Sequence, residues 1–96
     1  MKGLPASFQV DVDAAVAILQ KHGAKEIYLF GSLATGEYSE NSDIDMAVRG
    51  IDPAVYLQAY ADLSFSIERR IDLLNMETQE RFSAMLFRQK ELIRVA

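Results

Sequence analysis

The run Gly31-Ser-Leu-Ala-Thr-Gly-Glu-Tyr-Ser-Glu-Asn-Ser-Asp-Ile-Asp-Met-Ala-Val48 decides the fold of this chain. It opens with a glycine turn, Gly31-Ser32, and closes with a segment in which one residue separates Asp43 from Asp45. Because successive side chains of a strand alternate between its two faces, both aspartates are expected on the same face. The apolar residues of this segment are then expected to face a core: Ile44, Met46 and Val48. Two carboxylates so close together repel each other unless a cation lies between them, so the run predicts a metal site on a strand.

Hydrophobic periodicity and turn residues predict further elements on both sides of this run. Strands are expected over residues 26–30, 43–48 and 70–74, and helices over residues 11–22, 53–63 and from residue 77 or 78 onward. Residues 33–42 are expected to form a polar loop, and residues 92–95 could add a short strand or a docking segment. The order α-β-β-α-β-α predicts an α+β domain, in which helices pack on a small mixed β-sheet.

Residues with capping propensity set the predicted helix ends. Asp11 is expected to cap the first helix and Gly23 to end it. Asp11 and Asp13 also form a second D-x-D, which we interpret as acids favoured by the dipole at a helix N-terminus. Asp52 followed by Pro53 is a favourable N-cap and first-turn pair for the second helix. The residues of that helix expected to face inward are Leu57, Tyr60 and Ala61.

Length and composition predict one small domain, residues 1–96, in which half of the residues are apolar. A chain this short has a small stability margin, which a partner protein would increase. The net charge of −4 argues against direct nucleic-acid binding, which normally needs clustered Lys and Arg. The absence of cysteine excludes disulfides and thiolate metal sites.

The sequence shows neither a membrane span nor a signal segment. No apolar run is long enough to cross a bilayer, and residues 1–5 are not a hydrophobic leader. We therefore expect a cytoplasmic protein that does not associate with a membrane.

Asp72 is a third informative acid, because it lies within the apolar segment Arg70-Ile-Asp-Leu-Leu74. A carboxylate in such a segment is costly to bury unless it is paired or bound to a metal. By itself it could equally form a salt bridge with Arg69 or Arg70, or lie at a strand edge. Asp43 and Asp45 favour the metal interpretation. Three aspartates on two adjacent strands can bind two Mg²⁺ or Mn²⁺ ions about 4 Å apart, the arrangement used for in-line phosphoryl and nucleotidyl transfer.

Gly31 and Ser32 could serve the nucleotide side of such a reaction. Glycine lets the backbone approach a phosphate closely, and the Ser32 hydroxyl can bond to triphosphate oxygens. Taken alone, this pair would more often be an ordinary turn at the end of a strand. The G-x-x-x-x-G spacing of residues 31–36 is not a P-loop, because Glu37-Tyr38 stands where Lys and Ser or Thr would follow. A calcium loop starting at Asp43 fails as well, because Val48 occupies its glycine position.

Together these residues resemble the minimal nucleotidyltransferase (MNT) family of the DNA polymerase β-like superfamily. The family pattern is Gly-Ser, about ten residues, Asp-x-Asp and a third Asp on a later strand, matched here by Gly31-Ser32, Asp43-x-Asp45 and Asp72. The closing run Leu86-Phe-Arg-Gln-Lys-Glu-Leu-Ile93 is similar too. One position departs from the pattern, because Thr35 stands where the family usually has Arg. A cationic contact is therefore missing or supplied elsewhere, for example by Arg49, Arg69 or Arg70.

The resemblance implies a polymerase β palm-like fold and a protein adenylyltransferase activity. Family members of this size are antitoxins, which use ATP and Mg²⁺ or Mn²⁺ to transfer AMP to a tyrosine of a HEPN-domain toxin, an RNase. The roles carried over place both metals on Asp43 and Asp45. Asp72 would hold the catalytic metal and help to activate the acceptor hydroxyl, and Gly31 and Ser32 would hold the β- and γ-phosphates.

Two alternatives remain open from the sequence. The chain could be a non-catalytic antitoxin that neutralises its toxin by binding alone, which Thr35 and the small core favour. It could also be a nucleotidyltransferase with a small-molecule acceptor, although the chain is short for a dedicated acceptor domain.

Overall fold

The computed structural model describes residues 4–89 and 91–96. Residues 1–3, which belong to the N-terminal segment considered above as a possible leader, therefore lie outside the described residues. Lys90 of the closing run lies outside them as well. The helices and strands follow in the order α1 (Ala6–Lys21), β1 (Glu26–Phe30), α2 (Ser32–Thr35), β2 (Ile44–Arg49), α3 (Pro53–Ser66), β3 (Ile71–Asn75), α4 (Glu80–Arg88) and β4 (Ile93–Arg94). No helix within the described ranges is long and apolar enough to cross a membrane.

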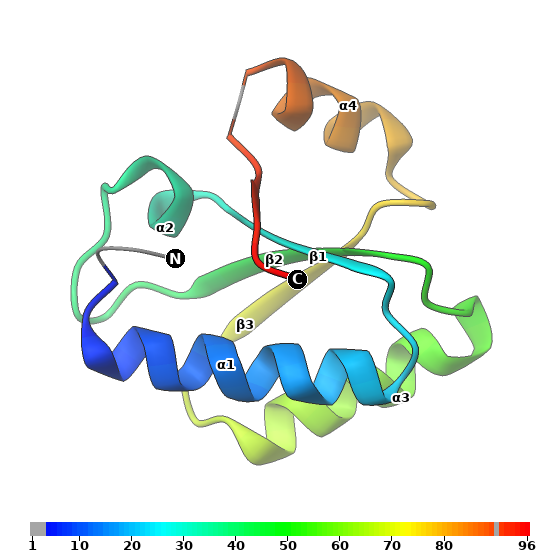
Figure 1. The fold of residues 1–96 in the computed structure, drawn as a ribbon, viewed down its shortest axis with the longest axis horizontal. Coiled ribbons are helices and arrows are strands. Elements are labelled where there is room, and N and C mark those ends of the chain that lie inside the picture. The colour runs from blue at the N-terminus through cyan, green and yellow to red at the C-terminus, as the bar shows by residue number, and fades with distance from the viewer. Residues whose placement is uncertain (1–3, 90) are drawn as a thin grey trace.

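The four strands form one mixed sheet in the order β3-β2-β1-β4 (Figure 1). β1 pairs antiparallel with both of its neighbours, whereas β2 and β3 are parallel. A parallel pair needs a crossover connection, and α3 supplies it. The predicted α+β class with a small mixed sheet is confirmed, and residues 92–95 do contribute a short edge strand, β4.

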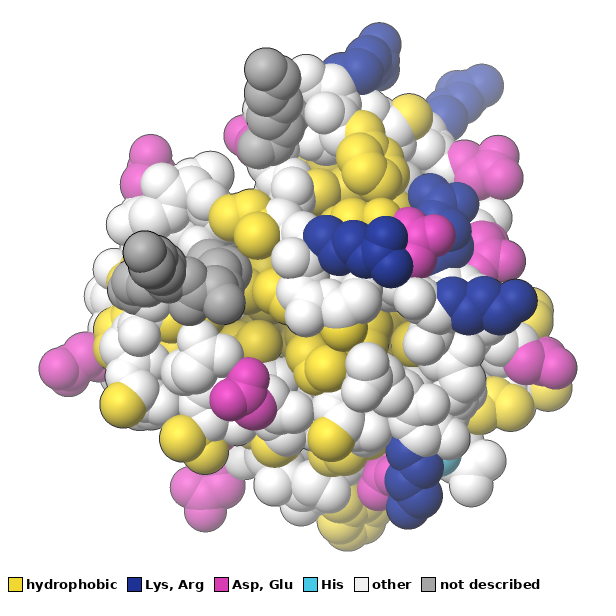
Figure 2. Space-filling view, viewed as in Figure 1, with side chains coloured by type: hydrophobic (Ala, Val, Ile, Leu, Met, Phe, Trp, Pro, Cys, Tyr) yellow, Lys and Arg dark blue, Asp and Glu magenta, His cyan; other side chains and the backbone are white. Residues whose placement is uncertain are grey.

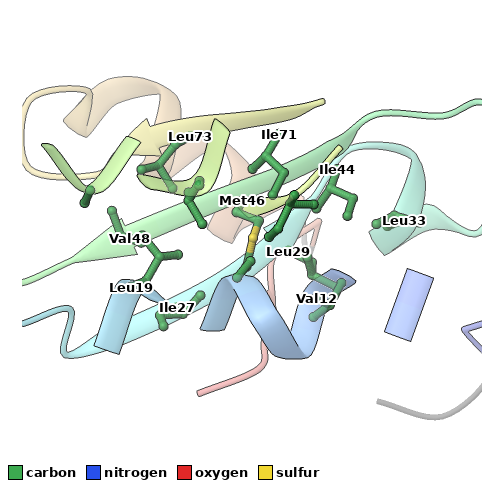
Figure 3. Close-up of a cluster of buried hydrophobic side chains, with 14 of the residues drawn as sticks. Val12, Leu19, Ile27, Leu29, Leu33, Ile44, Met46, Val48, Ile71 and Leu73 are labelled. Atoms are coloured by element: carbon green, nitrogen blue, oxygen red, sulfur yellow. The ribbon is translucent and has the colours of Figure 1, made fainter. Parts of the chain in front are cut away.

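One face of the sheet carries the main core. Figure 1 shows α1 and α3 together on one side of the sheet, with α4 on the other. The strand residues that point toward α1 and α3 alternate along the sequence, as predicted for β2, where Ile44, Met46 and Val48 are fully buried. Figure 3 shows these side chains interlocking with Leu19 and Val12 of α1. Burying this apolar surface is the main term that stabilises the fold.

The opposite face has a smaller apolar cluster, made of Tyr28, Ala47 and Met76. α4 covers it through two edge-to-face ring contacts, Phe82 on Phe30 and Phe87 on Tyr28. On the surface seen in Figure 2, yellow hydrophobic side chains lie between interspersed basic and acidic ones. Phe82 and Phe87 of α4 remain 39% and 45% exposed, so α4 only partly closes its side of the sheet.

The first helix starts earlier than predicted, because Pro5 rather than Asp11 precedes its first turn. Asp11 therefore lies inside α1, and its interpretation as an N-terminal acid was wrong. Its carboxylate instead accepts a hydrogen bond from Arg69 Nε at 3.1 Å. Gly23, with φ of +96°, follows the helix end as predicted.

Four other details differ from the predictions, and one agrees with them. α2 occupies part of the segment that was expected to be loop, and α4 begins at Glu80 rather than at residue 77 or 78. The Asp52 carboxylate caps α3 by accepting a hydrogen bond from the Ala54 amide at 2.9 Å, as expected. However, Leu57 on α3 is 79% exposed, so its predicted inward position was wrong. Ala61 is also exposed, because Ala59 and Leu63 form the buried stripe of that helix.

Candidate active site

Asp45 and Asp72 lie side by side on the parallel strands β2 and β3. The strand register pairs Asp45 with Asp72 on one side and with Phe30 of β1 on the other. Both carboxylates are on the partly closed face, because their strand neighbours Ile44 and Ile71 point into the main core. Asp43 comes immediately before β2 and is exposed. The structure thus brings together the three acids that were predicted from the sequence, two within strands and one at a strand start.

The electrostatics of Asp45 reflect this crowding. Desolvation raises the pKa of Asp45 above its ordinary value. The charges of Asp72 and Asp43 and a hydrogen bond with Asp72 raise that pKa further, whereas Arg70 lowers it. A hydrogen bond between two carboxyl groups needs a proton on one of them. The Asp45–Asp72 pair is therefore a place that favours either a shared proton or a cation.

Arg70 is the cationic side chain that touches these acids in the described part of the chain. Its Nη2 atom lies 3.3 Å from Asp72 Oδ1, and its Nε atom lies 3.9 Å from Asp43 Oδ2. Of the salt bridges considered from the sequence, Asp72 thus forms the one with Arg70. Sequence reasoning named Arg70 only as a possible partner, although Arg70 and Asp72 are two residues apart in extended chain and so share a face.

Arg69 has a different environment and does not contact the site acids. Its Nε atom pairs with Asp11, and its Nη1 atom donates to the carbonyl oxygens of Glu40 at 2.8 Å and Ser42 at 3.2 Å. Its guanidinium also lies 3.8 Å from the centre of the Phe8 ring. Arg69 therefore fastens the loop before β2 to α1.

The glycine turn lies directly against the Asp45 carboxylate. Gly31 has φ of +67° and ψ of −145°, a conformation that is essentially restricted to glycine. A Cβ atom on Gly31 would overlap Asp45 Oδ2 and lie 3.1 Å from its Cγ. The Gly31 carbonyl accepts hydrogen bonds from the amides of Ala34 and Thr35, and this starts α2 at Ser32. The structure therefore places Gly31 directly beside Asp45, and Ser32 follows it as the first residue of α2.

Thr35 gives the turn no positive charge. Its hydroxyl donates to the Ser32 carbonyl oxygen at 3.4 Å, on the exposed side of α2. The segment from Gly31 to Gly36 contains no basic residue. Any cation that helps to bind a phosphate here must come from another part of the fold.

The carboxylate oxygens suit Mg²⁺ or Mn²⁺, which prefer hard oxygen ligands. Asp45 and Asp72 fit this role, because they are in contact and the pKa of Asp45 is raised by desolvation and by the charges of Asp72 and Asp43. Within the described ranges, however, no three acidic or histidine side chains already converge as a metal-binding group. Asp43 instead faces Arg70, so a metal held by all three acids would require Arg70 to give up its contacts.

An open cavity of about 600 Å³ begins at Asp43 and Arg70. It extends between the loop before β2 and the end of α3, with Glu40 and Glu68 on its walls. No local sequence pattern predicts this cavity, because it is formed by segments that are distant in the chain. Of the three site acids, Asp43 lines this cavity, whereas Asp45 and Asp72 do not.

Comparison with known families identifies the chain. The Polymerase beta, Nucleotidyltransferase family matches residues 11–95. The match covers most of the chain and includes the glycine turn and all three aspartates. The chain therefore belongs to the polymerase β-like nucleotidyltransferase family.

Solved structures share the fold. A minimal nucleotidyltransferase is 24% identical, with 91% of this chain and 91% of that chain covered and a TM-score of 0.71. A toxin–antitoxin structure with AMP-PNP is 24% identical, with 76% and 59% covered and a TM-score of 0.54. A complex of a tri-AMPylated Shewanella oneidensis HEPN toxin with an MNT antitoxin is 23% identical, with 72% and 56% covered and a TM-score of 0.53.

These likenesses confirm the α+β nucleotidyltransferase fold. The chain spans less than two thirds of the chains that it matches in these two toxin–antitoxin structures. No curated protein matches the sequence.

Proposed function

We propose that this chain transfers AMP from ATP to a tyrosine hydroxyl of a HEPN-domain toxin and so acts as its antitoxin in the cytoplasm. The observation that carries the proposal is the register of β2 and β3, which sets Asp45 beside Asp72 with the Gly31 backbone against the Asp45 carboxylate. This arrangement places acids that need a cation next to a turn whose backbone can approach a phosphate closely.

The partner class is supported by the neighbours of the fold. One of them is an MNT antitoxin in complex with a HEPN toxin that carries three AMP groups, and another toxin–antitoxin structure contains the ATP analogue AMP-PNP.

The reaction requires a bond from the acceptor oxygen to the α-phosphorus. The tyrosine Oη–P bond forms as the bond between the α-phosphorus and the bridging oxygen to the β-phosphorus breaks, and pyrophosphate leaves with the bonding electrons. Asp72, beside Asp45, accepts the phenol proton or orients the hydroxyl. Asp43, Asp45 and Asp72 would hold Mg²⁺ or Mn²⁺, which when bound neutralises charge on the phosphates and favours ionisation of the acceptor hydroxyl. The Gly31 and Ser32 turn would hold the β- and γ-phosphates.

The test is label transfer from ATP labelled at the α-phosphate, with Mg²⁺ and the candidate HEPN toxin. We expect the wild-type chain to label the toxin. The Asp43→Asn/Asp45→Asn double variant should be slower by about 10³-fold or more, because metal-assisted charge stabilisation contributes several kcal/mol. Asp13→Asn is a matched control, since Asp13 is exposed on α1, where its carboxylate accepts a hydrogen bond from Gln9 Nε2. It should label the toxin at the wild-type rate.

A binding-only antitoxin is the second candidate, favoured by the ion pairs of Arg70 with Asp43 and Asp72, which partly neutralise these acids. It predicts an unlabelled toxin and full protection of cells by the Asp43→Asn/Asp45→Asn variant. Label on small acceptors in the absence of a toxin would instead support a small-molecule enzyme.

A further inference from the structure

Arg70 is held at the site by charge and by little else. Its side chain is 72% exposed, and both of its ion pairs are with the site acids Asp43 and Asp72. Exposed pairs of this kind contribute little to folding stability and can be exchanged for other partners. Arg70 can therefore leave these contacts without disrupting the core.

Arg69, its neighbour in the sequence, shows the opposite behaviour. Its side chain is only 19% exposed and is fixed by Asp11, two backbone carbonyls and the Phe8 ring. Arg49 is also distant from the acids, because it lies at the other end of β2 and pairs with Glu26 at 3.9 Å. Among these three arginines, Arg70 combines contact with the acids and freedom to move.

Charge balance indicates what happens to Arg70 when Asp43 and Asp72 bind a metal cation. Arg70 already places a positive charge beside one carboxylate oxygen of Asp72 and one of Asp43, and this charge opposes a second cation there. Arg70 and the metal therefore compete for these acids. Once released, the guanidinium is tethered one residue before β3, within reach of ligands that carry negative charge at the site. A guanidinium binds phosphate oxygens through two parallel hydrogen bonds, and the turn from Gly31 to Gly36 offers no cation of its own.

We propose that Arg70 has two successive roles: it is the counter-cation of Asp43 and Asp72 in the metal-free protein, and it binds the triphosphate once a metal has replaced it. The second role rests on the proposed use of a nucleoside triphosphate. Arg70 is thus a substrate-binding residue whose release is coupled to metal binding.

The test measures two affinities that do not depend on any acceptor or on turnover. Mn²⁺ binding without nucleotide is followed by calorimetry or by the electron paramagnetic resonance signal of free Mn²⁺. Nucleotide binding is measured with α,β-methylene-ATP, which cannot transfer AMP, at saturating Mn²⁺. We expect Arg70→Gln to bind Mn²⁺ roughly two- to fivefold more tightly, because the competing cation is gone. It should bind the nucleotide analogue roughly tenfold more weakly, because a charged hydrogen-bond donor is lost.

Two control variants make these opposite shifts specific. Arg49→Gln removes another exposed arginine that pairs with an acid, and it should leave both affinities unchanged. Arg70→Lys keeps the positive charge but lacks the two parallel hydrogen-bond donors of the guanidinium. Its Mn²⁺ affinity should therefore remain near that of the wild type, while its nucleotide affinity should lie between those of the wild type and Arg70→Gln. Equal Mn²⁺ affinities of wild type and Arg70→Gln would overturn the first role, and equal nucleotide affinities would overturn the second. Neither result depends on whether the acceptor is a tyrosine, so the failure of this inference is distinguishable from failure of AMP transfer.

Discussion

The two faces of the sheet differ in what they bury. The face under α1 and α3 contributes to a cluster of sixteen buried apolar residues among those described, whereas the opposite face has a buried cluster of three and carries Asp45 and Asp72. β2 serves both, because Met46 enters the core while Asp45, the residue before it, stands on the site face. The comparison shows that stability and chemistry can be assigned to alternate residues of one strand.

The site face also holds the unfavourable features of the fold. Asp45 has a raised pKa because it is partly desolvated and close to two other acids. Gly31 adopts a backbone conformation that other residues avoid. Such features are tolerated because the core on the other face supplies the stability. Substitutions on the two faces should therefore affect stability and metal binding differently.

The largest stability effect is expected on the core face. Leu29→Ala should lower the free energy of unfolding by about 2–5 kcal/mol, because Leu29 is fully buried and its truncation leaves a cavity. Leu57→Ala is the matched control, since Leu57 is 79% exposed, and it should change stability by less than about 0.5 kcal/mol. Urea unfolding followed by circular dichroism measures both. Similar losses in the two variants would contradict the assignment of the core to this face.

A smaller loss is expected at the turn beside the acids. Gly31→Ala should destabilise the fold by about 1–3 kcal/mol through backbone strain, and it should also weaken Mn²⁺ binding, because the added Cβ would displace the Asp45 carboxylate. Gly23 has a positive φ as well, but a Cβ there meets no atom within 4 Å. Gly23→Ala should therefore lower the unfolding free energy with unchanged Mn²⁺ affinity. The interpretation fails if both variants bind Mn²⁺ like wild type.

The two ends of α1 show how far the sequence predicts the fold. Local signals predicted the strand at 26–30, the Asp52 cap and the helix end before Gly23, because each depends on nearby residues. The start of α1 was missed, since Pro5 provides no side-chain cap and Asp11 mimics one. Asp11 instead pairs with Arg69, which is 58 residues away, and a contact of that range has no local signal.

The sequence predicted the acids of the site, but it did not predict that Arg70 is the cation in contact with them. Strand alternation was enough to put Asp43 and Asp45 on one face, and two adjacent strands were enough to bring Asp72 near them. The pairing of Asp45 with Asp72 depends on the register of the parallel strands, which the sequence does not specify. The different environments of Arg69 and Arg70, which are neighbours in the sequence, arise because only Arg70 lies on the site face.

Removing the crowded charge should stabilise the fold. Asp45→Asn is expected to raise the unfolding free energy near pH 7 by about 0.5–2 kcal/mol without added metal, the range typical of single stabilising substitutions. The folded-state pKa of Asp45 is raised above its ordinary value of 3.8, so ionised Asp45 destabilises the fold at every pH above the raised pKa. As the pH falls through that pKa, the folded wild type takes up its proton first, and the penalty disappears below the ordinary value.

The advantage of Asp45→Asn should therefore be full at neutral pH and shrink toward zero in acid. Thermal unfolding of both proteins between neutral pH and about pH 3.5 measures it, the lower limit being set by the ordinary aspartate pKa of ~3.9. An advantage that stays constant with pH would show that charge is not its cause.

The smallest effect is the stabilisation that a metal gives to the site face. When free Mg²⁺ equals its dissociation constant, binding to the folded state alone adds about 0.4 kcal/mol to the unfolding free energy, and the gain grows with concentration. We expect this gain in the wild type and in Asp13→Asn, whose substitution lies on α1, but not in Asp45→Asn. Thermal unfolding across a Mg²⁺ series measures the three curves. An equal rise in Asp45→Asn would mean that the ion acts elsewhere on an acidic surface. If the rise is confined to chains with Asp45, the cation relieves the same repulsion that the Asn substitution removes, and metal binding adds to a stability that the core already supplies.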